Sequence, residues 1–151
     1  MIGASMLAVT CATGSAAQAV PSKCMAAGRA SVEVRVQAPA GAEVGGLSLV
    51  VDYPEAAVAL PQSGDAEPVR QRVKGLPAGF MNTINDTDET LRIALASGNE
   101  KLADDASFKV EFDRCEGATM PPAKAFGCTV ESAAMTCGLP LDNVTCDVVI
   151  K

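Results

Sequence analysis

The residues best suited to hold a ligand form a polar segment near the middle of the chain. Asn85, Asp86 and Asp88, flanked by Asn82 and Glu89, could supply the oxygen ligands that Ca²⁺ prefers. The glycine-containing spacing of a calcium loop is missing. Asn, Asp and Thr side chains also provide the local backbone hydrogen bonds that a hairpin tip needs. A structural turn is therefore the favoured interpretation, and a calcium site built on Asn85, Asp86 and Asp88 is the alternative.

Residue types that carry catalysis are scarce. The sequence contains no histidine, which removes the usual general base and the commonest zinc ligand. A Ser-His-Asp triad or a Cys-His pair cannot be built without it. Carboxylates are plentiful, but a glycosidase cleft needs aromatic side chains, and the chain has no Trp, one Tyr and four Phe. The sequence therefore predicts a non-catalytic protein without a cofactor.

The cysteines predict disulfides. The six cysteines include no Cys-x-x-Cys pair, and histidine is absent, so disulfides in an oxidising compartment are favoured over a zinc site. They are Cys11, Cys24, Cys115, Cys128, Cys137 and Cys146.

The first nineteen residues have the character of a secretory signal. Met1 to Ala19 carry no charge and end in Ala17-Gln18-Ala19, an A-x-A cleavage pattern. The segment is too short and too weakly apolar for a membrane span. We therefore expect a signal peptide at 1–19, a single domain at 20–151, and a secreted protein, extracellular or periplasmic. The net charge of −6 argues against nucleic acid and anionic membranes as partners.

Alternation of apolar and polar residues recurs at short intervals after Ala30. Val32 to Val36 and Phe108 to Phe112 are the clearest strands, and the only helical candidate is a turn near 100–105. Phe108, Phe112 and Phe126 share the inward phase of their strands, which favours core positions over an exposed platform for sugars. The pattern predicts nine short strands in an antiparallel β-sandwich. The expected strands are 32–36, 47–53, 58–60, 69–73, 80–84, 91–95, 108–112, 126–130 and 144–150.

A basic stripe accompanies the expected strand at 69–73. Arg70, Arg72 and Lys74 alternate with apolar residues and so share one face. The favoured interpretation is a solvated face that protects an edge strand from pairing with other chains. An acidic partner is the alternative.

Several of these strands together resemble the cohesin-like sandwich, which is related to some carbohydrate-binding modules. The resemblance is carried by Val32–Val36, by Gly45–Pro54 with its apolar strand and Asp-Tyr-Pro ending, by Thr90–Gly98 and by Phe108–Phe112. The chain is also similar to cysteine-bearing exported bacterial proteins with Phe-Asp-x-Cys and Phe-x-Cys elements. The resemblance implies a nine-stranded jelly roll.

For function, the resemblance implies an interaction module that binds a protein partner in an extracellular or cell-surface assembly. Cohesins grip dockerin through polar residues on two strands, but the matching positions here are Gly45, Leu47 and Leu95 or Ala96, so those contacts do not carry over. A module that binds polysaccharide is the alternative, and a purely structural surface domain is a further one.

The disulfide pairing also follows from the resemblance. Cohesin topology places the first and last strands parallel and side by side, which implies a Cys24–Cys146 bridge and a Cys115–Cys128 bridge. Cys137 is then the free thiol. The competing arrangement joins Cys128 to Cys146, because strand alternation turns both side chains toward the core.

Overall fold

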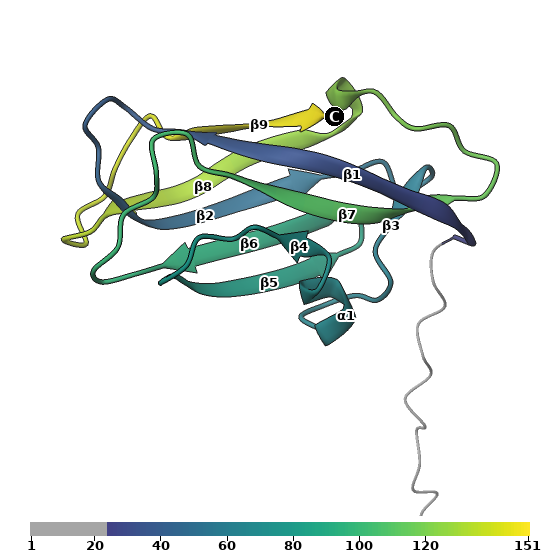
Figure 1. The fold of residues 1–151 in the computed structure, drawn as a ribbon, viewed down its shortest axis with the longest axis horizontal. Coiled ribbons are helices and arrows are strands. Elements are labelled where there is room, and N and C mark those ends of the chain that lie inside the picture. The colour runs from purple at the N-terminus through teal and green to yellow at the C-terminus, as the bar shows by residue number, and fades with distance from the viewer. Residues whose placement is uncertain (1–23) are drawn as a thin grey trace, which may run out of the picture.

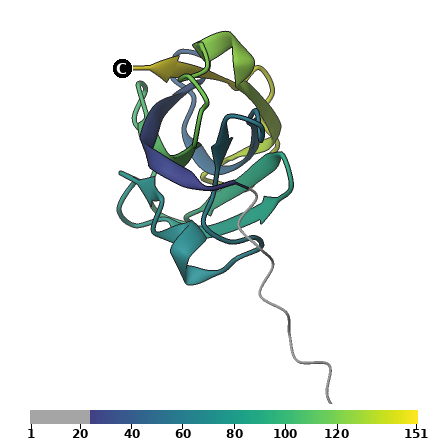
Figure 2. The same cartoon turned by 90° about the vertical axis from the view of Figure 1, so that its right-hand side faces the viewer.

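The computed structural model describes residues 24–151, and the expected signal peptide at 1–19 lies outside the described residues. Two antiparallel sheets face each other around one apolar core, as Figures 1 and 2 show. The prediction of an all-β, sandwich-like fold is therefore confirmed. The elements are β1 (Ala26–Gln37), β2 (Val44–Asp52), β3 (Val58–Ala59), α1 (Glu67–Arg70), β4 (Val73–Lys74), β5 (Met81–Thr87), β6 (Thr90–Ala96), β7 (Ser107–Cys115), η1 (Ala123–Ala125), β8 (Gly127–Met135) and β9 (Thr145–Ile150).

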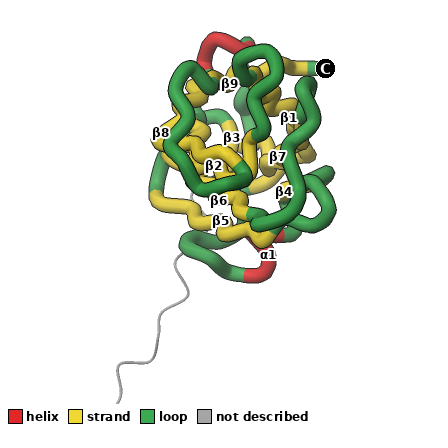
Figure 3. The backbone as a smooth tube through the Cα atoms, turned by 90° about the vertical axis from the view of Figure 1, so that its left-hand side faces the viewer, coloured by secondary structure: helices red, strands yellow, loops and turns green. Residues whose placement is uncertain are grey.

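The first sheet has the order β3-β7-β1-β9. β4 also pairs with β7, at Lys109 and Val110, whereas β3 pairs with it at Asp113 and Arg114. The second sheet has the order β5-β6-β2-β8. Every pairing between these strands is antiparallel. Figure 3, an end view, shows the strands of the two sheets curling round the space between them.

The period-two pattern decides which side chains enter the core. Val32, Val34 and Val36 point inward from β1, and Phe112 at the centre of β7 is fully buried. Successive strand residues face opposite sides of a sheet, so the polar residues between them face solvent or the sheet's outer surface. Phe108 and Phe126 are also buried, which confirms the prediction that these rings belong to the core.

The region 67–74 differs from the expected strand at 69–73. Glu67–Arg70 forms a single helical turn with proline near its start, and only Val73–Lys74 pair as a strand. Backbone N–H groups in the first turn of a helix have no partner within the helix, so Pro68 costs no hydrogen bond there. Glu67 pairs with Arg70 three residues later. The segment 100–105, expected as a helical turn, contains a turn at Asp104 and Asp105 and no helix.

The first and last strands lie side by side as predicted, but the predicted parallel direction is wrong. β9 runs antiparallel to β1, with Cys146 opposite Val36 near the end of β1. Cys24 precedes the start of that 12-residue strand. At about 3.3 Å per residue the two cysteines lie far beyond the 7 Å between Cα atoms that a disulfide allows. The Cys24–Cys146 bridge implied by the cohesin resemblance therefore cannot form.

The observed bridges are Cys24–Cys115 and Cys128–Cys146. Ala26 pairs with Cys115 in the β1–β7 ladder, so the end of β7 lies beside the residues that precede β1. The expected Cys115–Cys128 bridge is also wrong. Cys115 lies opposite the start of β1, whereas Cys128 is bridged to Cys146, which lies opposite Val36 near the end of β1. The competing Cys128–Cys146 arrangement is the one found. Cys137 is the free cysteine among the described residues, and it is exposed.

Candidate binding surface

The polar segment proposed as a calcium site forms the hairpin between β5 and β6. Asp86 points into the sandwich and is 1% exposed, whereas Asn85 on the alternate phase is half-buried on the outer side. Asp88 lies at the tip with a φ of 49°. The structure therefore does not bring these three side chains together. Within residues 24–151 it contains no group of three or more acidic or cysteine side chains that could hold a metal.

Asp86 instead accepts a hydrogen bond inside the protein. The Tyr53 hydroxyl donates to its Oδ1 at 2.8 Å, and the same hydroxyl contacts the Asp88 carbonyl oxygen at the hairpin tip. Burial raises the pKa of the Tyr53 hydroxyl, and the hydrogen bond to the Asp86 carboxylate raises it further. Backbone hydrogen bonds between Asp86 and Gly64 hold the strand in place on its other side. Asp86 is thus a buried structural connection between the hairpin and Tyr53, which follows β2.

The aromatic side chains are withdrawn from both outer faces. Tyr53 is 3% exposed, and its ring centroid lies 5.0 Å from that of Phe112. Phe112 in turn lies 5.8 Å from Phe126. Phe80 is half-buried against the core, and these residues with Phe108 are all the aromatic residues in the sequence. All of these aromatic residues lie in the described part of the chain. None of them presents its ring on a flat outer surface on which a sugar could stack.

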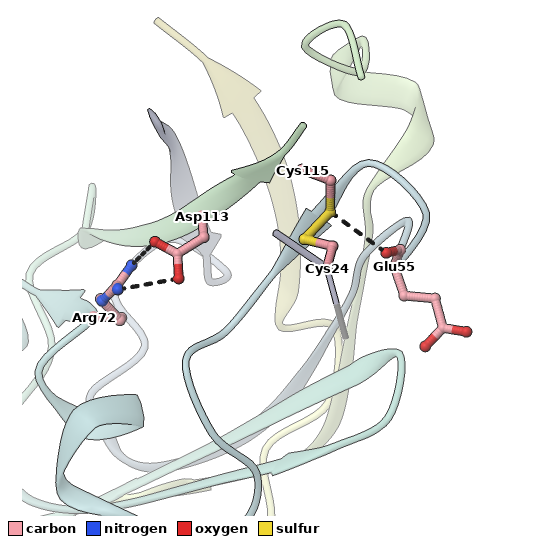
Figure 4. Close-up of a disulfide and its surroundings, with 5 residues drawn as sticks. All are labelled: Cys24, Glu55, Arg72, Asp113 and Cys115. Carbon is pink, nitrogen blue, oxygen red and sulfur yellow. Dashed lines mark hydrogen bonds and ion pairs between the residues drawn. A yellow bond between two sulfur atoms is a disulfide. The ribbon is translucent and has the colours of Figure 1, made fainter. Parts of the chain in front are cut away.

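The basic stripe expected at 70–74 is dispersed. Arg70 lies on α1 and pairs with Glu67 at 2.7 Å. Arg72 is 12% exposed and makes two hydrogen bonds to the Asp113 carboxylate, at 2.9 and 3.2 Å. Figure 4 shows this fork beside β7, a short way along the strand from the Cys24–Cys115 bridge. Only Lys74 of the three remains on a strand and exposed.

The Glu55 carbonyl oxygen lies 3.9 Å from the Cys115 sulfur, and the two are joined by a dashed line in Figure 4. A bridged sulfur carries no hydrogen to donate, so this is a packing contact. Together the bridge and the Arg72–Asp113 fork fix the end of β7 against the segments that flank it.

The outer face of the β3-β7-β1-β9 sheet is crowded with charges. Arg29 lies 3.4 Å from Asp113 and 3.7 Å from Glu111. Glu33, on the same strand as Arg29, is 7% exposed and pairs with Arg35 and with Lys151. These hydrogen bonds, from Lys151 first and Arg35 second, hold the pKa of the Glu33 carboxyl below its usual range.

The outer face of the β5-β6-β2-β8 sheet has a different character. Its centre consists of small or uncharged side chains, and we call it the four-stranded face. In the β2–β6 ladder Ser48 stands opposite Ala94 and Val50 opposite Arg92, all on the side away from the buried Leu49 and Ile93. The outward residues at its centre are Ser48, Val50, Thr83, Ala94, Thr129 and Ser132. No helix covers this face in the described part of the chain, as Figures 1 and 3 show.

One ion pair crosses the four-stranded face. Arg92 on β6 reaches over β2 and donates to both carboxylate oxygens of Glu131 on β8, at 3.0 and 2.9 Å. The Ser48 hydroxyl lies 3.4 Å from the same carboxylate. The hydrogen bond from Arg92 lowers the pKa of the Glu131 carboxyl and raises the pKa of the Arg92 guanidinium. A bidentate pair of this kind fixes two long side chains in one orientation.

Sequence reasoning did not find this pair. Alternation indicates that Arg92 faces outward, because it lies between the apolar residues Leu91 and Ile93. The partner lies 39 residues away on a strand that is not adjacent to β6. The register shift in the β2–β8 ladder next to Glu131 further conceals its orientation.

Comparison with known proteins finds no matching family model, no curated protein similar to the chain and no matching solved structure. A membrane-spanning helix is likewise not found among the helices of residues 24–151, which are too short for that role.

Proposed function

We propose that this chain is a non-catalytic, exported binding module that recognises a protein partner through the four-stranded face. The observation that carries the proposal is the contrast between the two outer faces. One is occupied by several ion pairs around Glu33 and Asp113, whereas the other carries one ion pair from Arg92 among small, uncharged side chains. Protein interfaces are depleted of charge at their centres and enriched in arginine.

The positions of the aromatic residues favour a protein partner over polysaccharide. Flat carbohydrate sites depend on exposed rings, and Tyr53, Phe108, Phe112 and Phe126 are all less than a tenth exposed. A protein partner needs no such platform. Within this proposal the fold is a variant of the cohesin-like jelly roll in which the first strand pairs antiparallel with the last. Two disulfides are consistent with an oxidising, extracellular or periplasmic location.

Binding assays with defined probes test the proposal. The purified chain, immobilised, is offered a set of dockerin modules and extracts of extracellular protein in one arm, and a glycan array in the other. Substitution Ala94→Arg places a long charged side chain at the centre of the four-stranded face. Ala40→Arg makes the same change at an exposed turn between β1 and β2 and serves as the matched control.

We expect a saturable protein partner whose binding is lost with Ala94→Arg and kept with Ala40→Arg. Saturable glycan binding without a protein partner would overturn the choice of partner class. A protein partner that binds both variants equally would overturn the choice of surface.

A further inference from the structure

A groove lies at the end of the sandwich where β1 ends and β7 begins, away from the four-stranded face. Its first part is an apolar hollow of about 250 Å³ between the two sheets. Val36 from β1, Phe108 from β7 and Leu95 from β6 line it, with Leu102 from the β6–β7 loop. These side chains belong to the buried core, so the hollow gives access from solvent to the apolar interior.

A cationic hollow of about 330 Å³ adjoins the apolar one, and both are lined by Gly75, Ser107 and Phe108. Its charged lining residues are Lys74, Lys109, Lys151 and Glu33, three cations and one anion. Glu33 is already paired with Lys151 and Arg35. Two positive charges are thus left over in a protein whose net charge is −6.

The two remaining lysines face each other. Lys74 on β4 is directly opposite Lys109 on β7, and both are exposed. Neither forms an ion pair with any residue of the described chain. Like charges in directly opposed positions destabilise a sheet, and an anion placed between them would remove that repulsion.

A third hollow, of about 390 Å³, shares Ser107 with the other two and carries the opposite charge. Asp104 and Asp105 line it together with Glu33 and Arg35, and Asp105 also lies at the apolar hollow. A bound acidic group is therefore attracted to the lysine side and repelled from the aspartate side. This asymmetry would orient an elongated ligand in one direction along the groove.

We infer that this groove binds a peptide segment of a partner protein in which an apolar side chain is followed by an acidic one. The apolar side chain enters the hollow beside Phe108, and the carboxylate lies between Lys74 and Lys109. The two hollows share Gly75, Ser107 and Phe108 in their lining, so the two subsites adjoin and neighbouring side chains of one peptide can reach both. An apolar anchor in a concave pocket with charges at its rim is the usual arrangement of a peptide-binding hot spot.

An acidic polysaccharide would satisfy the lysines but has no apolar side chain to fill the apolar hollow. The groove lies on a different surface from the four-stranded face, so neither assignment depends on the other.

Titration of the ¹⁵N-labelled full chain by NMR tests the inference. The probes are the capped peptide Gly-Leu-Glu-Glu-Gly, its glutamine analogue Gly-Leu-Gln-Gln-Gly, and trigalacturonic acid, each up to about 5 mM, so that a millimolar Kd is measurable. We expect saturable shifts at the amides of 102 and 107–109 with the acidic peptide. The glutamine analogue should bind at least about threefold more weakly, and added salt should weaken the binding of the acidic peptide.

Three variants separate the subsites. Lys74→Glu should weaken binding of the acidic peptide at least about threefold, and it replaces the lysine repulsion across the β4–β7 pair with an attraction. Ala103→Phe fills the apolar hollow from its exposed rim and should weaken the binding of both peptides. Lys124→Glu, at an exposed position on η1, is the control and should bind as the unaltered chain does.

An absence of saturable shifts with the acidic peptide, or unchanged binding by Lys74→Glu, would overturn the assignment. So would tighter binding of trigalacturonic acid than of the acidic peptide, which would identify the groove as a polysaccharide site.

Discussion

The Tyr53–Asp86 hydrogen bond offers the most direct test of how this fold is held together. Substitution Tyr53→Phe removes one oxygen and leaves the ring in place against Phe112, 5.0 Å away. The hydroxyl that is lost donates to a carboxylate that is 1% exposed. Because the ring remains, the substitution creates no large cavity, and its cost reports mainly on the hydrogen bond.

A hydrogen bond to a charged group contributes about 1.5–3 kcal/mol net, so we expect Tyr53→Phe to lower the free energy of unfolding by about 2 kcal/mol. In a domain of this size that corresponds to a fall in Tm of roughly 4–8 °C. Substitution Asp86→Asn keeps an acceptor at the same place but removes its charge. In that background the loss of the hydroxyl should cost only about 1 kcal/mol, the value typical of a neutral hydrogen bond.

Urea denaturation followed by far-UV circular dichroism measures these values, since the chain has no Trp and Tyr53 is its single tyrosine. Thr129→Val, which removes an exposed hydroxyl from β8, is the control and should change stability by less than about 0.5 kcal/mol. A cost below about 0.5 kcal/mol for Tyr53→Phe would refute the reasoning. Equal costs in the Asp86 and Asn backgrounds would show that the acceptor's charge is not what the hydroxyl stabilises.

Peptide mapping without reduction of the chain that begins at Val20 should return the two bridges described above and one free thiol, Cys137. Loss of the Cys128–Cys146 bridge by double alanine substitution should cost about 3 kcal/mol on the loop-entropy scale, and a cost near zero would contradict that account. Arg92 lowers the pKa of Glu131 in the folded state, so this pair stabilises the fold above the ordinary value of 4.5 and the contribution is lost as pH falls through the depressed folded pKa. Glu131→Gln should therefore make the free energy of unfolding depend less on pH below 4.5. A pH profile identical to that of the unaltered chain would count against the pair. The intact mass of the secreted protein should correspond to a chain beginning at Val20; retention of the preceding segment would disprove cleavage there.

Much of the fold could be predicted because the relevant patterns are local. Inward Val32, Val34 and Val36 follow from alternation within five residues, and the burial of Phe112 follows from the same rule in β7. The short helix at Glu67–Arg70 was missed because a single turn carries no periodicity of its own. Its alternating Val69 and Arg70 are equally compatible with a strand, and only Pro68 favours the start of a helix.

The disulfides could not be obtained in this way, because they depend on the relative direction of strands far apart in the chain. Cys24 and Cys146 flank the first and last strands, and a parallel arrangement would have brought them together. The antiparallel β1–β9 ladder reverses that relation and leaves Cys24 next to Cys115 instead. The alternation of Cys128 and Cys146 was the better guide, since it depends only on which side of each strand faces the core.

The position of the Cys128–Cys146 bridge also bears on the proposed binding surface. β8 forms one edge of its sheet and β9 one edge of the other, so no ladder of hydrogen bonds joins them. The bridge supplies a covalent connection at that edge and ties β8 to the opposite sheet. Three residues beyond Cys128, the same strand carries Glu131, whose carboxylate holds Arg92 across β2. The four-stranded face is thus supported at its β8 edge by a covalent bond and across its centre by an ion pair. A surface fixed in this way loses little conformational entropy when a partner binds. This is the physical advantage of a binding face on a sheet that a disulfide holds in place.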